Sequence, residues 1–254
     1  MSVGGLVRKA VKGAVLASNP AAALLWKRER DEVRRVSERH DRLRTRPTDL
    51  ARFAEDNARL AASPDPMRVV LLGASITEEM DASRVGPSAV NRGVSGELVW
   101  QQLLRFRADV LALEPGAVVL KACAVNFGQG APDAGLVKEH VAWMAELASS
   151  RGIRPILATT VPITAAYDRE SPGSMVAIRA FNGWVRLSAA RRGYTVADYE
   201  AALGTDRGFL GPELSTDGLH LTAAGYGRMV DVARAAIDRA FAEPAPGSAR
   251  IASA

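Results

Sequence analysis

The sequence predicts a three-layer α/β/α sandwich with a mostly parallel central sheet, preceded by a helical extension at the N-terminus. The chain has 254 residues, of which 48% are hydrophobic and 24% charged, so it is long enough to bury one sizeable core. Short apolar runs alternate along it with longer segments of helical spacing. This alternation is typical of βαβ units and therefore of a parallel sheet covered by helices.

Four apolar runs are expected to form strands. The first, residues 67–73, reads MRVVLLG and is uninterrupted, which is typical of a parallel strand buried on both faces. Similar runs lie at residues 117–122 and 154–160, and a weaker one at 195–197. Helical spacing fills the segments 97–113, 133–150, 174–192 and 222–241.

The N-terminal part differs in composition from the rest. Residues 1–52 carry 13 Lys and Arg against 6 Asp and Glu, whereas residues 53–254 carry 20 against 22. Residues 29–60 suit a helix with a break at Pro47, and the Pro-rich stretch 63–66 ends it. We therefore expect a basic helical extension over residues 1–65, an α/β domain over 66–242 and a flexible tail over 243–254.

The basic excess could contact anionic lipid, nucleic acid or an acidic partner. A solvated helical face is the simplest interpretation, and weak contact with a membrane surface through residues 1–52 is the alternative. No RNA-binding signature accompanies the charges, so no nucleic-acid partner is expected. The apolar run 13–26 is too short to span a bilayer and resembles a secretory signal poorly, so we expect a cytoplasmic protein, with secretion or membrane association as alternatives. The single cysteine, Cys123, is expected to be a buried structural thiol.

Polar residues that follow the predicted strands are the first candidates for a site, because ligands of open parallel sheets bind beyond the carboxyl ends of the strands. Ser75 follows the first run at a strand-to-helix turn. Gly93 lies in the turn-like stretch 91–96, and Asn126 follows the run 117–122. Taken singly, these residues are explained as well by a helix cap, a turn and a loop-capping side chain.

An acid and an imidazole lie three residues apart shortly before the last predicted helix. Asp217 and His220 belong to the segment STDGLHLT, in which Thr222 is the expected N-cap of that helix. A carboxylate bonded to one ring nitrogen would leave the other nitrogen free to take a proton from Ser75. His40 and His140 lie in charged helical surroundings and are expected at the surface.

Together, Ser75, Gly93, Asn126 and the pair Asp217 and His220 resemble the four blocks of SGNH hydrolases, the superfamily of GDSL-type esterases and lipases. The order and the strand-end placement match over residues 67–241. The resemblance implies the flavodoxin-like SGNH fold. It also implies a catalytic triad of Ser75, Asp217 and His220, with an oxyanion hole formed by the N–H groups of Ser75 and Gly93 and the side chain of Asn126.

The chain departs from the family pattern at two places. Ala74 stands where the GDS motif carries Asp, and Ala124 and Phe127 change the third block, so we expect bulk there to reshape the oxyanion loop.

The expected activity is hydrolysis of a small-molecule carboxylic ester through an acyl-serine. An acyltransferase with the same intermediate, or a non-catalytic binding protein of this fold, are the alternatives. No metal or cofactor is expected, because no metal-ligand or phosphate-binding motif occurs. The oligomeric state, the acyl-chain length and the alcohol part of the substrate stay open.

Overall fold

The computed structural model describes residues 48–128, 131 and 133–246. The chain divides into two compact units, Met1–Arg46 and Pro47–Ala254. The expectations for residues 1–47 and for most of the C-terminal tail lie outside the described residues. The described helices and strands belong to the second unit.

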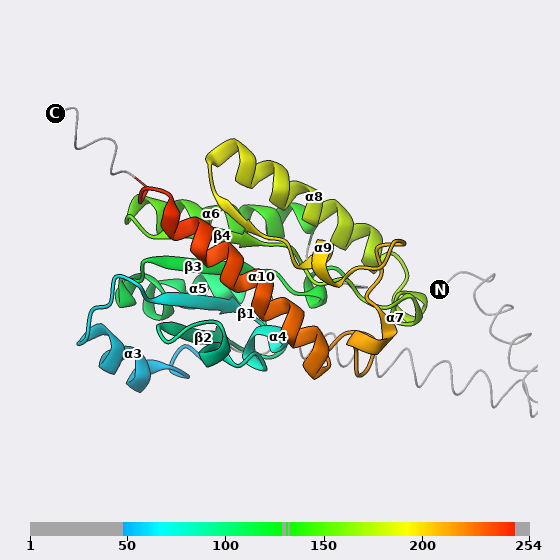
Figure 1. The fold of residues 1–254 in the computed structure, drawn as a ribbon, viewed down its shortest axis with the longest axis horizontal. Coiled ribbons are helices and arrows are strands. Elements are labelled where there is room, and N and C mark those ends of the chain that lie inside the picture. Colours follow the sequence, from blue (N-terminus) through cyan, green and yellow to red (C-terminus); the bar gives the residue numbers. More distant parts are fainter. Residues whose placement is uncertain (1–47, 129–130, 132, 247–254) are drawn as a thin grey trace, which may run out of the picture. The chain divides into compact units, whose positions relative to one another are not determined.

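Helices and strands alternate through this unit as the sequence predicts (Figure 1). The strands are β1 (Val69–Gly73), β2 (Ala89–Gly93), β3 (Ala117–Lys121), β4 (Arg154–Ala158) and β5 (Thr195–Ala197). The α-helices are α3 (Ala54–Ala61), α4 (Ser75–Glu78), α5 (Val99–Asp109), α6 (Ala134–Ser150), α7 (Ala165–Glu170), α8 (Ser174–Arg192), α9 (Tyr199–Leu203) and α10 (Ala223–Ala242). Short 3₁₀ turns lie at Ala82–Arg84, Leu111–Leu113, Ala124–Asn126 and Pro212–Leu214. Thr222 caps α10 as expected, since its hydroxyl accepts a hydrogen bond from the Gly225 N–H at 3.3 Å.

The strands form one parallel sheet in the order β2-β1-β3-β4-β5. Val69 of β1 pairs in register with Ala89 of β2 on one side and with Ala117 of β3 on the other. All five residues of β1 and of β3 are buried, as expected of central parallel strands. The edge strand β2 has only two buried residues and was not predicted, because its sequence AVNRG shows neither an apolar run nor alternation.

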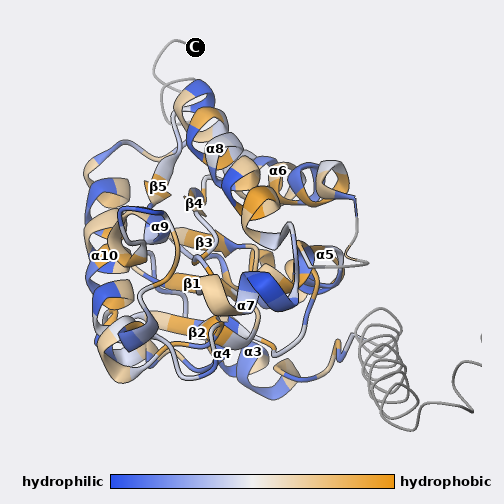
Figure 2. Ribbon diagram, turned by 90° about the vertical axis from the view of Figure 1, so that its right-hand side faces the viewer, coloured by the Kyte–Doolittle hydropathy of each residue, from blue (hydrophilic) through white to orange (hydrophobic). Residues whose placement is uncertain are grey.

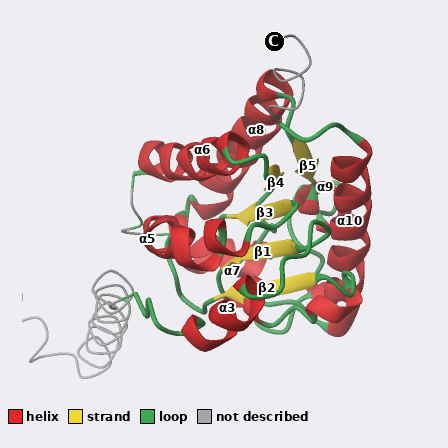
Figure 3. Ribbon diagram, turned by 90° about the vertical axis from the view of Figure 1, so that its left-hand side faces the viewer, coloured by secondary structure: helices red, strands yellow, loops and turns green. Residues whose placement is uncertain are grey.

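The sheet separates two apolar cores, which makes the fold three-layered. Val70 and Leu72 of β1 face the core shared with α5, α6 and α8. Val69 and Leu71 face the opposite core, shared with α4, α9 and α10. Figures 2 and 3 show α10 on one side of the apolar strands and α5 and α6 on the other. The predicted α/β/α architecture is therefore confirmed.

Helix α3 packs against the sheet edge through charged groups, although it lies before the boundary expected at residue 65. The buried guanidinium of Arg92, on β2, donates to Asp56 and to Asn57 at 2.7 Å each. Asn57 in turn donates to Asp109 at 2.6 Å. Residues 48–65 are thus part of the compact unit, and a boundary at residue 65 would cut this network.

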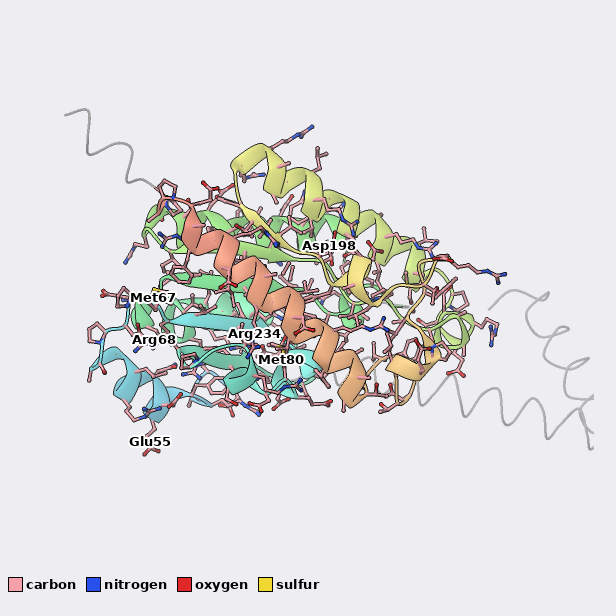
Figure 4. The ribbon with its side chains drawn as sticks, in the orientation of Figure 1. Glu55, Met67, Arg68, Met80, Asp198 and Arg234 are labelled. Atoms are coloured by element: carbon pink, nitrogen blue, oxygen red, sulfur yellow. The ribbon has the colours of Figure 1, made fainter. Side chains whose placement is uncertain are left out.

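The carboxyl ends of the strands define the edge of the sheet at which the candidate site lies. Figure 4 labels Met67 and Arg68 at the opposite, amino end of β1, while Figure 1 shows α7 beyond the carboxyl ends of the strands. None of the helices in the described part of the chain combines the length and the apolar character needed to cross a membrane.

Candidate active site

Ser75 begins the short helix α4 directly after β1. Ala74, the N-cap of α4, has an extended backbone (φ −112°, ψ −144°) and turns the chain sharply, so Ser75 is the first helical residue. Gly73 permits this turn, because a Cβ there would lie 2.1 Å from the Thr77 hydroxyl oxygen. The side chain of Ser75 does not cap the helix: its hydroxyl is 3.0 Å from Nε2 of His220. The expected strand-to-helix turn is confirmed, and the helix-cap interpretation of Ser75 is wrong.

His220 and Asp217 come from the loop that precedes α10. Nδ1 of His220 lies 2.7 Å from a carboxylate oxygen of Asp217, and the other oxygen accepts the N–H groups of Leu219 and His220 at 2.9 and 2.7 Å. Partial burial alone would raise the pKa of Asp217, but these hydrogen bonds, those from His220 foremost, outweigh it and lower the pKa to about 2. Asp217 is therefore ionised at neutral pH and faces a protonated Nδ1.

This geometry assigns the tautomer of His220. With its proton on Nδ1, directed at Asp217, the imidazole presents the lone pair of Nε2 to the hydroxyl of Ser75. Ser75, His220 and Asp217 thus form one chain of hydrogen bonds, with the polarity that a general base requires.

The loop is held in shape by Ser215 and Gly218. Ser215 donates its hydroxyl to the carbonyl of His220 and accepts the N–H of Gly218, both at 2.8 Å. Gly218 has a positive φ of 93°, and a Cβ there would lie 2.8 Å from the Thr164 hydroxyl oxygen. A glycine is therefore required between the two catalytic candidates Asp217 and His220.

Asn126 is buried at the end of the turn that follows β3, with 1% of its surface exposed. Its Oδ1 accepts the N–H of Val99, and its Nδ2 donates to the carbonyl of Cys123, both at 3.0 Å. These two bonds fix which atom of the amide is nitrogen. Because the amide nitrogen carries two hydrogens and this bond uses one, a second donor hydrogen is available.

Gly93 does not match its expected role. Its N–H donates to Oδ1 of Asn91 at 2.8 Å, so this donor is already engaged. A Cβ on Gly93 would lie 2.2 Å from the backbone nitrogen of Glu78, which means that the glycine is needed for packing of α4 against β2. This hydrogen bond therefore does not favour the Gly93 N–H as an oxyanion donor.

Gly96, three residues further, is the glycine that sequence reasoning passed over. It has a positive φ of 76°, and among the described residues its N–H has no hydrogen-bond partner. The stretch NRGVSG contains both glycines, so the sequence alone could not choose between them. The choice depends on where the N–H of Gly93 bonds.

The residues that depart from the family pattern, Ala74, Ala124 and Phe127, are buried in the fold. Phe127 is 5% exposed and packs on Phe181 with 5.0 Å between ring centroids, so its ring fills the core. Ala74 and Ala124 are buried as well. Cys123 is a buried thiol, as expected, and lies 3.1 Å from the amine of Lys121.

Of the other two histidines, His140 is half-buried on α6 and lies against the Trp143 ring, with 5.4 Å between ring centroids. His40 lies outside the described residues.

A cavity of about 530 Å³ adjoins the loop of Asp217. The segment 164–170, which holds α7, forms one wall, and residues between 205 and 218 form the other. Apolar side chains include Tyr167, Phe209 and Leu210, and the arginines Arg169 and Arg207 lie in the same lining. Within the described residues, no three His, Cys, Asp or Glu side chains are grouped so that they could hold a metal ion.

Comparison with known proteins identifies the family of the chain. The model of the GDSL-like Lipase/Acylhydrolase family matches residues 60–228, which is more than half of the chain. A GDSL-like lipase of Bacteroides thetaiotaomicron VPI-5482 is 30% identical with a TM-score of 0.68, covering 76% of this chain and 98% of its own. An acylhydrolase candidate of Bacteroides fragilis NCTC 9343 is 28% identical with a TM-score of 0.70, covering 76% and 97%.

More distant structures share the fold. A lipase/acylhydrolase of Enterococcus faecalis is 22% identical, with a TM-score of 0.57 over 68% of this chain and 96% of its own. Among curated proteins, no sequence matched. With the extent of the family match, these findings lead to one conclusion: the chain belongs to the GDSL-like lipase/acylhydrolase family.

Proposed function

We propose that this acylhydrolase cleaves a carboxylic ester through an acyl-serine intermediate on Ser75. The observation that carries the proposal is the continuous hydrogen-bond chain from Ser75 to His220 at 3.0 Å and from His220 to Asp217 at 2.7 Å. In this reading, His220 removes the hydroxyl proton as Ser75 attacks the ester carbonyl. It then returns that proton to the leaving alcohol.

Three donors would stabilise the negative charge that develops on the carbonyl oxygen. They are the N–H of Ser75, the N–H of Gly96 and the second hydrogen on Nδ2 of Asn126. Among the described residues, neither backbone N–H has a hydrogen-bond partner. A buried Asn126 with both amide atoms held by the backbone is a preorganised donor, which is the property that lowers the barrier.

The second half of the reaction uses the same groups. Water would take the place of the alcohol, His220 would accept its proton, and the acyl-serine would be cleaved to give the free acid. Asp217 stays ionised throughout, because its pKa is about 2, and it stabilises the imidazolium formed in each half.

The cavity beside Asp217 and Gly218 is the place we propose for one part of the substrate. Its walls combine aromatic and aliphatic side chains with two arginines, so it would accept a group with an apolar body and a polar end.

A series of p-nitrophenyl esters of increasing acyl length tests the proposal. We expect time-dependent release of p-nitrophenol by the wild type and loss of that release in Ser75→Ala and His220→Ala. Turnover that survives in Ser75→Ala, or a folded wild type that cleaves no ester of the series, would contradict it.

A further inference from the structure

The carboxylate of Glu78 joins the helix of the nucleophile to the loop of Gly96. Glu78 is the last residue of α4, three residues after Ser75. One of its oxygens accepts the N–H of Ser95 at 2.7 Å and also the Ser95 hydroxyl. Ser95 directly precedes Gly96, so this carboxylate holds the backbone next to the proposed oxyanion donor.

The other oxygen of Glu78 is paired with Arg52. The guanidinium of Arg52 donates to it in a close ion pair, in which 36% of the Arg52 side chain and 26% of the Glu78 side chain are exposed. Arg52 precedes α3, far from Glu78 in the sequence. A partly buried carboxylate that accepts two hydrogen bonds from Ser95 and one from the cation Arg52 is well ordered, because each of its oxygens is engaged.

A second set of hydrogen bonds joins helix α4 to strand β2. Nδ2 of Asn91, on β2, donates to the carbonyl of Thr77 at 2.6 Å and to that of Met80 at 2.8 Å. The Val94 N–H donates to the carbonyl of Gly73 at 3.2 Å. Strand β2 is therefore bonded to the end of helix α4, and the start of the loop after β2 is bonded to the end of β1.

The segment that carries Arg52 is itself anchored to the catalytic unit. The next residue, Phe53, has two guanidinium groups over its ring. The guanidinium carbon of Arg92 lies 4.6 Å from the ring centroid, and that of Arg105 lies 5.9 Å from it. Arg105 is buried and pairs with Glu97, one residue after Gly96, at 2.8 Å. Residues on both sides of Gly96 are thus tied to charged groups near residues 52–53.

From this arrangement we infer that Glu78 is a positioning residue for the oxyanion hole and that Arg52 holds Glu78 in place. The inference rests on the proposed function. Glu78 contacts no reacting atom; it sets the distance between Ser75 and Gly96 through Ser95. The segment before α3 thereby controls the catalytic geometry from outside the residues 60–228 that the family model matches.

The test compares Glu78→Gln, Arg52→Met and Arg52→Lys, with Arg59→Ala as the matched control. Arg59 forms an exposed ion pair with Asp56 on the same segment, and 73% of its side chain is exposed. Glutamine keeps the shape of Glu78 but turns an amide toward either Arg52 or Ser95. Loss of one whole oxyanion donor costs about 10²–10³ in rate. We therefore expect displacement of the Gly96 N–H in Glu78→Gln to lower kcat by about 10- to 100-fold.

Two readouts separate positioning from folding. We expect the KM for p-nitrophenyl acetate and the Tm of each variant to stay near the wild-type values. The kcat is expected to fall in Glu78→Gln and Arg52→Met and to be restored in Arg52→Lys. Backbone hydrogen exchange of residues 94–98 is expected to quicken in the two impaired variants and to match wild type in Arg59→Ala.

Wild-type kcat in Glu78→Gln, or an unchanged exchange rate at residues 94–98, overturns the inference. A kcat loss that appears equally in Arg59→Ala overturns it as well. If the wild type cleaves no ester, the proposed function fails, and the exchange measurement alone then decides whether Glu78 positions the loop.

Discussion

Replacing Asn126 with alanine is expected to lower both the rate of ester hydrolysis and the stability of the fold, by amounts that can be separated. The side chain is buried and holds the backbone at two points, the N–H of Val99 and the carbonyl of Cys123. Alanine removes these two bonds together with the donor hydrogen that we assign to the reaction.

The two losses have different sizes. A buried N–H of Val99 left without a partner costs about 1–3 kcal/mol of unfolding free energy. Loss of one oxyanion donor lowers kcat by about 10²–10³, equivalent to about 2.7–4 kcal/mol of transition-state stabilisation. The first loss reduces the folded fraction in denaturant, whereas the second reduces the turnover of each folded molecule.

Asn182→Ala is the matched control. Asn182 is fully buried and holds Thr160 in the same way, accepting its N–H at 2.7 Å and donating to its carbonyl at 2.9 Å. It is not bonded to Ser75 or His220. We expect urea denaturation to show a similar loss of stability in both variants, with kcat reduced strongly only in Asn126→Ala.

Two results would refute this reasoning. One is a folded Asn126→Ala enzyme with the wild-type kcat. The other is an equal fall of kcat in Asn182→Ala, which would mean that the rate follows general loosening of the strand ends and not the donor.

Three other predictions concern the acid of the triad, the core and an ion pair. Asp217→Asn is expected to lower kcat by about 10²–10⁴, since the His220 tautomer loses its anionic partner; kcat within tenfold of wild type in steady-state assays would contradict this. Phe127→Ala is expected to cost about 3–5 kcal/mol of unfolding free energy, because the ring is buried in the core; an unchanged urea midpoint would count against it. Burial would raise the pKa of Asp198, but the hydrogen bond and the charge of Arg186 outweigh it, so the pKa is lowered. The ion pair therefore stabilises the fold above about pH 4, and this stabilisation is lost as the pH falls through the lowered pKa. Arg186→Gln is thus expected to be less stable by about 1 kcal/mol at pH 6, a difference that shrinks toward pH 2, and a pH-independent difference in thermal unfolding would argue against the assignment.

The sequence was sufficient for the elements whose signal is local. The apolar runs of β1, β3 and β4 are buried on both faces, and the turn at Ser75 and the cap at Thr222 follow from neighbouring residues. These features do not depend on distant partners, so periodicity and residue type predict them.

The edge strand and the glycine assignment depended on distant contacts. Arg92 is polar in sequence but buried in β2, because Asp56 and Asn57 of α3 neutralise and bond it. No local pattern could reveal that pairing. Likewise, the sequence offers two glycines near Asn91, and only the hydrogen bond from Gly93 to Asn91 shows that Gly96 is the one whose N–H has no partner within the described part of the chain.

The three residues of the proposed triad could be predicted as a set, but their geometry could not. Ser75 and His220 lie 145 positions apart, and the 3.0 Å contact between them requires the whole sheet to bring two strand-end loops together. The positioning role inferred for Glu78 had no counterpart in the sequence at all, because it depends on Arg52 and Ser95 meeting one side chain.

The most direct test of the central claim is covalent labelling of Ser75 by a fluorophosphonate, located by peptide mass spectrometry. The account predicts an adduct on Ser75 in the wild type, none in Ser75→Ala, and strongly slowed labelling in His220→Ala, because the base that activates the hydroxyl is then missing. An adduct on another residue, or folded wild-type protein that stays unlabelled across several such probes, would contradict the account.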